Sequence, residues 1–343
     1  MNDLFYLKSL EEAKSEADVA NRADSSGGKT ENREVIPGGR HSDLCGAGKA
    51  GCGRGTEDFD GSDGADSSGG SNEKYIAVID SGLGGISVLA PLCRELPEEK
   101  FLYFGDNGNA PYGSRTESDL LSLTMRNLDY ILSFGVKGIV VACNTLSATL
   151  LKDIENYSGV KCFGVYPPVF PPLLAGKKTL LFATPFTSSR YRAVRGLYIA
   201  ETAGLASAIE KNAFHLNNIN IEDELNKCRV YFCTGKFAVG GTPVAKNLPA
   251  RSLLSPPDHR ARFDVVILGC THYLFVKNKI VDHLQPSLTL CGNDFTVKAV
   301  KKFFEKRKSS VFKRGNAPLF IGKYADFNEK FYREVVMAAQ NFL

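Results

Sequence analysis

Short apolar runs alternate with longer stretches of mixed polarity from about residue 75 to the end of the chain. The runs that have the length and β-branched or aromatic character of buried strands are 75–79, 101–104, 139–142, 161–165, 179–183 and 265–268. The stretches between them predict helices, the longest over 117–134 with Thr116 or Ser114 as its N-cap. Strands that alternate with helices are typical of a parallel sheet covered on both faces, so we expect an α/β fold.

A cluster of prolines at 167–172 indicates a boundary between two such α/β units. We expect a first domain over 74–166 that is completed by 288–343, and a second domain over 167–287. Within the second domain, 189–211 predicts a helix and 229–233 a strand. The Pro-, Gly- and Arg-rich segment 238–262 predicts no regular element.

The first 73 residues have a different composition from the rest. Residues 22–73 contain 13 glycines and almost no apolar residues, and Ala-Asp-Ser-Ser-Gly-Gly occurs at both 23–28 and 65–70. Such a segment cannot bury enough apolar area to offset its chain entropy. Residues 1–73 are therefore predicted to be a disordered, low-complexity arm.

Composition excludes several classes of protein. Hydrophobic residues make up 43% and charged residues 23% of the chain, which is typical of a globular protein, and a net charge of +4 gives no indication of nucleic-acid binding. No apolar run approaches the ~20 residues that a membrane span requires, and the N-terminus lacks a signal-peptide pattern. Nine cysteines without framework spacing favour reduced thiols and a cytoplasmic location.

Two of the expected strands end in the same kind of polar group. Cys143, Asn144 and Thr145 follow the run 139–142, and the run 265–268 leads through Gly269 to Cys270, Thr271 and His272. Ligands of open α/β sheets bind at the carboxyl ends of strands. For Cys143, the helix that follows favours the thiolate form at its N-terminus.

Paired cysteines, one from each domain, predict proton transfer at a carbon next to a carboxylate. Inversion there needs a base on one face of the ligand and an acid on the other, so the site is expected in the cleft between the domains. Asp80, which follows the strand 75–79, would assist Cys143, and His272 would assist Cys270. The groups expected to hold the amino and carboxyl groups of the substrate are Ser81, Asn144, Thr145 and Thr271.

Two other interpretations of these residues remain open at the level of sequence. Cys143, Cys270 and His272 are zinc-ligand types, although no local Cys-x-x-Cys pair accompanies them. Asp80 precedes the glycine-rich turn Ser81–Gly85, where it could act only as a cap for the following helix.

From residue 75 onwards the chain resembles the glutamate racemases of the aspartate/glutamate racemase superfamily. The matching stretches are Asp80-Ser-Gly-Leu-Gly-Gly-Ile-Ser-Val88, Gly105-Asp106, Pro111-Tyr-Gly113, Ala142-Cys-Asn-Thr145, Gly269-Cys-Thr-His-Tyr273 and Leu319-Phe-Ile-Gly322. Each motif alone is weak, but their order and spacing together are highly specific.

The resemblance implies an isomerase that interconverts L- and D-glutamate without metal or other cofactor, supplying D-glutamate for peptidoglycan and hence for cell-wall biogenesis and cell shape. It implies two Rossmann-like doubly wound α/β domains with the active site in the cleft between them, and often a homodimer. Cys143 and Cys270 would be the acid/base pair. The residues it implies as substrate-binding or assisting are Asp80, Ser81, Tyr112, Gly113, Asn144, Thr145, Thr271 and His272.

The chain departs from the family pattern in four places. The N-terminal arm has no counterpart, Val165-Tyr-Pro-Pro168 lacks the usual Glu-Pro, and Leu274 replaces a proline. The region 205–262 matches poorly and lacks the usual Cys-Pro. These departures leave two alternatives open: an aspartate racemase, or a catalytically impaired homologue that binds an amino acid and acts as a regulator.

Overall fold

The computed structural model describes residues 74–170, 175–213, 215–238, 243–254, 263–306, 318–322 and 333–334. The expected arm, 1–73, lies outside the described residues. The C-terminal stretch 326–342, for which the sequence also predicts a helix, lies outside them too, apart from residues 333–334.

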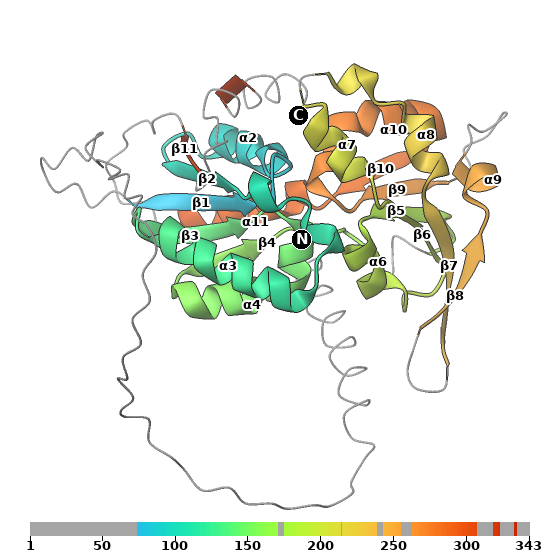
Figure 1. The fold of residues 1–343 in the computed structure, drawn as a ribbon, viewed down its shortest axis with the longest axis horizontal. Coiled ribbons are helices and arrows are strands. Elements are labelled where there is room, and N and C mark those ends of the chain that lie inside the picture. Colours follow the sequence, from blue (N-terminus) through green and yellow to red (C-terminus); the bar gives the residue numbers. More distant parts are fainter. Residues whose placement is uncertain are drawn as a thin grey trace, which may run out of the picture. The chain divides into compact units, whose positions relative to one another are not determined.

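The described part of the chain contains two β-sheets with helices packed against them (Figure 1). The first has the order β11-β2-β1-β3-β4, and all its strands are parallel. Its strands are β1 (Tyr75–Asp80), β2 (Phe101–Gly105), β3 (Val136–Val141), β4 (Lys161–Gly164) and β11 (Leu319–Ile321). The expected strands 75–79, 101–104, 139–142 and 161–165 are confirmed within one residue at their ends, except that β3 begins three residues earlier than expected.

Helices cover both faces of the first sheet. Ile76, Val78 and Val140 face α2 (Ile86–Glu95) and α11 (Asn293–Glu305) in one apolar cluster. Ala77 and Ile79, the alternate residues of β1, face α3 (Glu117–Leu132) and α4 (Asn144–Ser158) in another. This alternation explains why the strands read as continuous apolar runs, since neither face meets water. Thr116 caps α3 as expected, accepting a hydrogen bond from Asp119 N.

The second sheet has the order β10-β9-β5-β6-β7-β8. Its strands are β5 (Thr179–Ala183), β6 (Leu197–Glu201), β7 (Arg229–Phe237), β8 (Pro243–Leu248), β9 (Val265–Leu268) and β10 (Leu288–Cys291). The first four in sheet order are parallel, whereas β7 and β8 are antiparallel to their neighbours. The described helices of this half are α6 (Pro185–Tyr191), α7 (Leu205–Lys211), α8 (Ile221–Asn226), α9 (Ala250–Leu254) and α10 (Lys277–Leu284).

The antiparallel β7–β8 hairpin is the main addition to the expected doubly wound fold. The prediction of a strand at 229–233 is confirmed and extended to Phe237, but β8 lies in the segment for which no element was expected. Its burial pattern is mixed and it includes Pro243, as is typical of an edge strand. An edge strand has few buried positions and so needs few apolar residues. Its sequence therefore does not stand out as a strand.

Two expectations about the second half of the chain are wrong. The helix expected over 189–211 is interrupted by the strand β6, which pairs with β5 and β7. Gly196, with φ +82°, ends the preceding segment in a conformation that a continuing helix cannot adopt. The return to the first domain was expected at residue 288, but Leu288–Cys291 pairs with β9 in the second sheet. The chain crosses back only with α11, which packs against α2.

Contacts join the two sheets where their strands end. Ser87 Oγ of α2 donates to the carbonyl of Thr271 (3.1 Å), and this hydroxyl is itself held within the first half by Asn293 Nδ2 of α11 (2.9 Å). Gly113 lies so close to Thr184, at the start of α6, that a Cβ on it would be 2.7 Å from the threonine Cβ. No helix in the described part of the chain combines the length and apolar character needed to cross a bilayer.

Candidate active site

Cys143 lies at the carboxyl end of β3, where it is the N-cap residue of α4. Its side chain is buried, and Sγ is 4.0 Å from Ser81 Oγ. Burial raises the pKa of the Cys143 thiol to about 12, and the nearby Asp80 carboxylate adds to this. The backbone N–H groups of Leu146 and Thr145 act in the opposite direction, but more weakly. The expectation that the helix N-terminus favours a thiolate is therefore outweighed by desolvation.

Asp80 lies at the end of β1 and is 2% exposed. One carboxylate oxygen, Oδ2, accepts hydrogen bonds from Gly85 N (2.7 Å) and Gly82 N (3.4 Å). The other, Oδ1, has no partner among the described residues. Burial raises the pKa of the carboxyl from 3.8 to about 6, against opposing effects of His272 and the Gly85 N–H. Asp80 thus binds the turn, as the capping interpretation requires, and keeps a second oxygen free for proton exchange.

Cys270 follows β9 on the other sheet and contacts a histidine. Its Sγ is 3.5 Å from His272 Nδ1, and His272 Nε2 is 2.6 Å from Glu210 Oε1. Burial disfavours a charged His272, but Cys270 and Glu210 together outweigh it and raise the pKa of the imidazole well above 6.5. The imidazole therefore favours its protonated form beside Cys270.

Glu210 is the main group that the sequence did not indicate. It lies on α7 with 17% of its side chain exposed, in the stretch that was expected to be one long helix. It accepts a second hydrogen bond from Leu83 N (2.8 Å), in the turn after β1. Sixty-two residues separate Glu210 from His272 in the chain, so no local spacing could have paired them.

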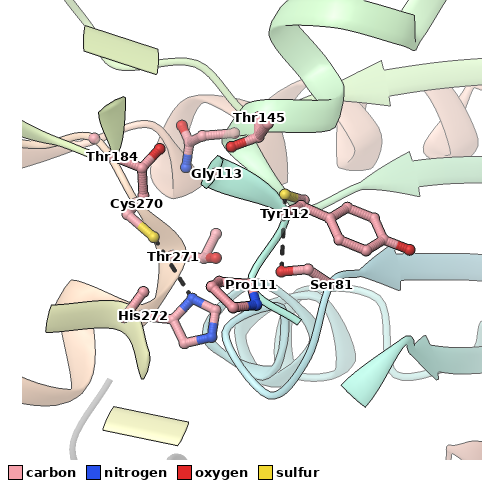
Figure 2. A pocket seen from close by; sticks show the side chains of 13 residues that line it. Ser81, Pro111, Tyr112, Gly113, Thr145, Thr184, Cys270, Thr271 and His272 are labelled. Carbon is pink, nitrogen blue, oxygen red and sulfur yellow. Dashed lines mark hydrogen bonds between the residues drawn. The ribbon is translucent and has the colours of Figure 1, made fainter. Parts of the chain in front are cut away.

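A cavity between the two sheets is lined by residues from both. They are Ser81, Pro111, Tyr112, Gly113, Cys143, Asn144, Thr145, Thr184, Ala206, Gly269, Cys270, Thr271 and His272. Figure 2 shows Cys270 and Thr184 on one side of it, Ser81 and Tyr112 on the other, and Cys270 directed toward the His272 ring. All the residues predicted from sequence line this cavity except Asp80, which lies behind the Ser81–Gly85 turn. Thr184 was missed, although its place directly after β5 satisfies the strand-end rule that found Cys143.

Tyr112 and Asn144 contribute to the cavity in different ways. The Tyr112 ring points away from Cys270 (Figure 2), and its hydroxyl donates to Asp106 Oδ2. Asp106 is itself buried and also accepts from Asn127 Nδ2 (2.9 Å), so this network fixes the short 3₁₀ helix η2 (Tyr112–Ser114) at the cavity wall. Asn144 is 5% exposed, and its Oδ1 has no partner among the described residues, which leaves an acceptor for a ligand.

The zinc interpretation finds no matching geometry. Within the described residues no group of three or more His, Cys, Asp or Glu side chains is arranged to hold a metal ion. The two ring nitrogens of His272 instead contact Cys270 Sγ and Glu210 Oε1.

The known proteins that are similar to this chain in sequence and in structure include several glutamate racemases. No family model matches the chain. The glutamate racemase of Clostridium botulinum (strain Loch Maree / Type A3) is 27% identical over 277 residues, which is 77% of this chain and 95% of the relative. That of Clostridium novyi (strain NT) is 28% identical over 268 residues, 74% and 93% of the two chains. The crystal structure of glutamate racemase from Thermus thermophilus in complex with β-chloro-D-alanine is 25% identical, with a TM-score of 0.56 over 78% of this chain and 93% of that one.

Proposed function

We propose that this chain, a homologue of the glutamate racemases, is itself an amino-acid racemase that interconverts L- and D-glutamate. One observation carries the proposal: two buried cysteines from the strand ends of different sheets line the same cavity, and each has its own ionisable partners. A racemase needs that arrangement, because the proton must leave one face of Cα and return on the other.

The chemistry requires only the two thiols and the groups behind them. A thiolate on one side removes the proton from Cα and becomes a thiol, and the electron pair is delocalised into the substrate carboxylate. The thiol on the other side then donates its proton to the opposite face of Cα and becomes a thiolate. The configuration is inverted, protons balance, and neither a metal ion nor pyridoxal phosphate takes part.

The two thiols differ in the groups beside them. Burial and Asp80 raise the pKa of Cys143 to about 12 and keep it a thiol, ready to donate, whereas Cys270 lies beside His272, whose pKa is raised well above 6.5. Asp80, with a pKa of about 6, is suited to exchange a proton with Cys143 near neutral pH. We infer that the resting enzyme first accepts the enantiomer whose α-proton faces Cys270.

Neutral groups and helix ends would bind the substrate. None of the described residues that line the cavity is Lys or Arg. The substrate carboxylates would be held by N–H groups at the start of α4, near Asn144 and Thr145, and at the start of the 3₁₀ helix η4 (Thr271–Val276). Ser81 and Asn144 Oδ1 supply acceptors for the amino group. Gly113 lies against Thr184 at the cavity wall, and Tyr112 lies on the side away from Thr184 (Figure 2).

Aspartate is the second candidate substrate, because the region 205–262 matches the pattern of the glutamate racemases poorly. A racemisation assay with each acid, followed by Cα exchange in deuterated water, decides between them. Glutamate turnover with deuterium incorporated at Cα is expected, and activity should survive dialysis against EDTA. Binding of glutamate without exchange at Cα would contradict the proposal and favour a regulatory homologue.

His272→Asn should lower kcat by about 10²- to 10⁴-fold, because Cys270 loses the imidazole that contacts its sulfur and can exchange a proton with it. Enantiomers have equal free energies, so kcat/KM falls equally in both directions. The primary isotope effect should nevertheless rise for the 2-deuterated enantiomer that Cys270 deprotonates, and fall for the other. His283→Asn is the matched control, since His283 Nε2 contacts only the Leu254 carbonyl of α9 in the described structure (2.7 Å) and should leave kcat unchanged. Equal isotope effects for both enantiomers of the His272 variant would contradict the assignment.

The proposed reaction supplies D-glutamate for peptidoglycan, as the resemblance implies, and with it a role in cell-wall biogenesis and cell shape. The proposed partner is the amino acid alone. A homodimer and a cytoplasmic location belong to the same proposal. Sedimentation analysis of the full chain would test whether it forms a homodimer.

A further inference from the structure

The turn Ser81–Gly85 lies between the two acid/base groups of the site. On one side, its backbone N–H groups at Gly82 and Gly85 donate to Asp80, which serves Cys143. On the other, Leu83 N donates to Glu210, which holds His272 beside Cys270. A single turn of the first sheet therefore touches the ionisable partners of both thiols.

Three glycines in this turn face these groups at close range. A Cβ on Gly82 would lie 1.9 Å from Glu210 Oε1, and one on Gly84 would lie 2.5 Å from His272 Nδ1. A Cβ on Gly85 would lie 2.7 Å from the Asp80 Cβ and 2.9 Å from the Tyr103 hydroxyl. Contacts shorter than 3.0 Å force one of the two groups to move.

Backbone conformation does not account for these glycines. The described glycines with positive φ are Gly135, Gly159, Gly176, Gly196 and Gly235, and no glycine of the turn is among them. Gly85, for instance, has φ −63°, which any residue adopts. The turn therefore has glycines because side chains would occupy the space that Glu210, His272 and Asp80 fill.

We propose that Gly82 is a positioning residue for the Cys270 half of the site, leaving the space in which the Glu210 carboxylate must lie to hold His272. The inference rests on the proposed racemase function for its kinetic consequences. Glu210 comes from α7, behind the second sheet, whereas Gly82 and Leu83 follow β1 of the first. The pairing of Glu210 with His272 therefore depends on the first sheet, although both residues belong to the second half of the chain.

Gly82→Ala is a clean probe of this role. The nearest atoms to the new methyl group are Glu210 Oε1, Cδ and Oε2, the far end of a flexible side chain, so the turn can remain in place while the carboxylate is displaced. We expect kcat for glutamate racemisation to fall by about 10- to 100-fold with little change in KM, because His272 loses its partner and its orientation. The isotope effects of the two 2-deuterated enantiomers should become unequal in the same sense as for His272→Asn.

Gly204→Ala is the matched control. Gly204 lies directly before α7, the helix that carries Glu210, and its Cβ would meet only Glu224 Oε2 at 3.4 Å, an ordinary contact. This variant should keep wild-type kcat and isotope effects. Wild-type kinetics in Gly82→Ala would overturn the proposal.

A double-mutant cycle separates positioning from general damage to the turn. With Glu210→Ala the carboxylate is gone, so Gly82→Ala should cause no further loss of kcat in that background. The double variant also lacks the close contact between the new methyl group and Glu210. It can therefore still be measured if Gly82→Ala alone does not fold. An additive loss of kcat would overturn the proposal.

Alkylation of the substrate-free protein tests the inference independently of the reaction. We expect Gly82→Ala to slow the alkylation of Cys270 by iodoacetamide at pH 7, as measured by mass spectrometry. The rate of alkylation of Cys143 should not change, so Cys143 serves as the internal reference. Equal rates for Cys270 in the variant and the wild type would overturn the positioning role. If the wild-type chain fails to racemise glutamate, the proposed function fails, while this measurement still decides the role of Gly82.

Discussion

Replacing either Cys143 or Cys270 with serine is expected to abolish racemisation of glutamate, with a loss of at least ~10³-fold in kcat. A serine hydroxyl is a far weaker acid than a thiol and cannot supply the base on its side of Cα. Since both faces of the carbon must be served in every turnover, one intact thiol is not sufficient. The measurement is the change in optical rotation of L- and D-glutamate in separate reactions.

Cys162→Ser is the control for this pair of variants. Cys162 is also a buried cysteine at a strand of the first sheet, but its Sγ contacts Ser158 and the carbonyl of Val160 rather than the cavity. We expect racemisation close to that of the wild type. Substantial activity in either Cys143→Ser or Cys270→Ser would refute the two-thiol mechanism, whatever the control shows.

Asp80→Asn is expected to lower kcat by about 10²- to 10⁴-fold and, at neutral pH, to stabilise the fold. The kinetic loss follows because an amide cannot exchange a proton with Cys143. The gain in stability follows because the wild-type carboxylate is buried with one oxygen unpartnered among the described residues, a cost that the neutral amide avoids. Function and stability thus oppose each other at this residue.

The stabilisation should depend on pH in a defined sense. The folded-state pKa of Asp80 is about 6 and lies above the 3.8 of an unperturbed aspartate. The folded state therefore binds the proton more tightly, and the contribution of Asp80 to stability is present below pH 4 and lost as the pH rises through 6. Over that range the loss amounts to about 3 kcal/mol. Urea unfolding should show Asp80→Asn more stable than the wild type by about this amount at pH 7.5, with the difference vanishing toward pH 4. A difference independent of pH would contradict the burial argument.

Much of the site could be predicted from strand ends. Apolar runs such as 139–142 and 265–268 have the length and composition of strands buried on both faces, and the polar groups that follow them fall at one edge of a sheet. Cys143, Cys270 and the small polar residues beside them were found in this way. Thr184 satisfies the same rule after β5, so its place at the cavity also has a signal in the sequence.

Glu210 and the role of Gly82 could not have been predicted in the same way. Glu210 belongs to a short helix that follows β6, and the signal for β6 was hidden because its apolar residues also fit a helix. Its contact with Leu83 joins residues 127 positions apart. The steric need for glycine at position 82 exists only once that carboxylate is in place.

The amino-acid sequence by itself determined which segments become buried strands and which reactive groups stand at their ends, because those properties follow from local periodicity. Only the tertiary structure decided that the two thiols share a cavity and that each has a different set of ionisable groups beside it. The physical reason is that pKa values depend on burial and on charges brought from distant parts of the chain. Desolvation keeps Cys143 protonated, whereas Cys270 lies beside His272, which in turn contacts Glu210, 62 positions away in the chain.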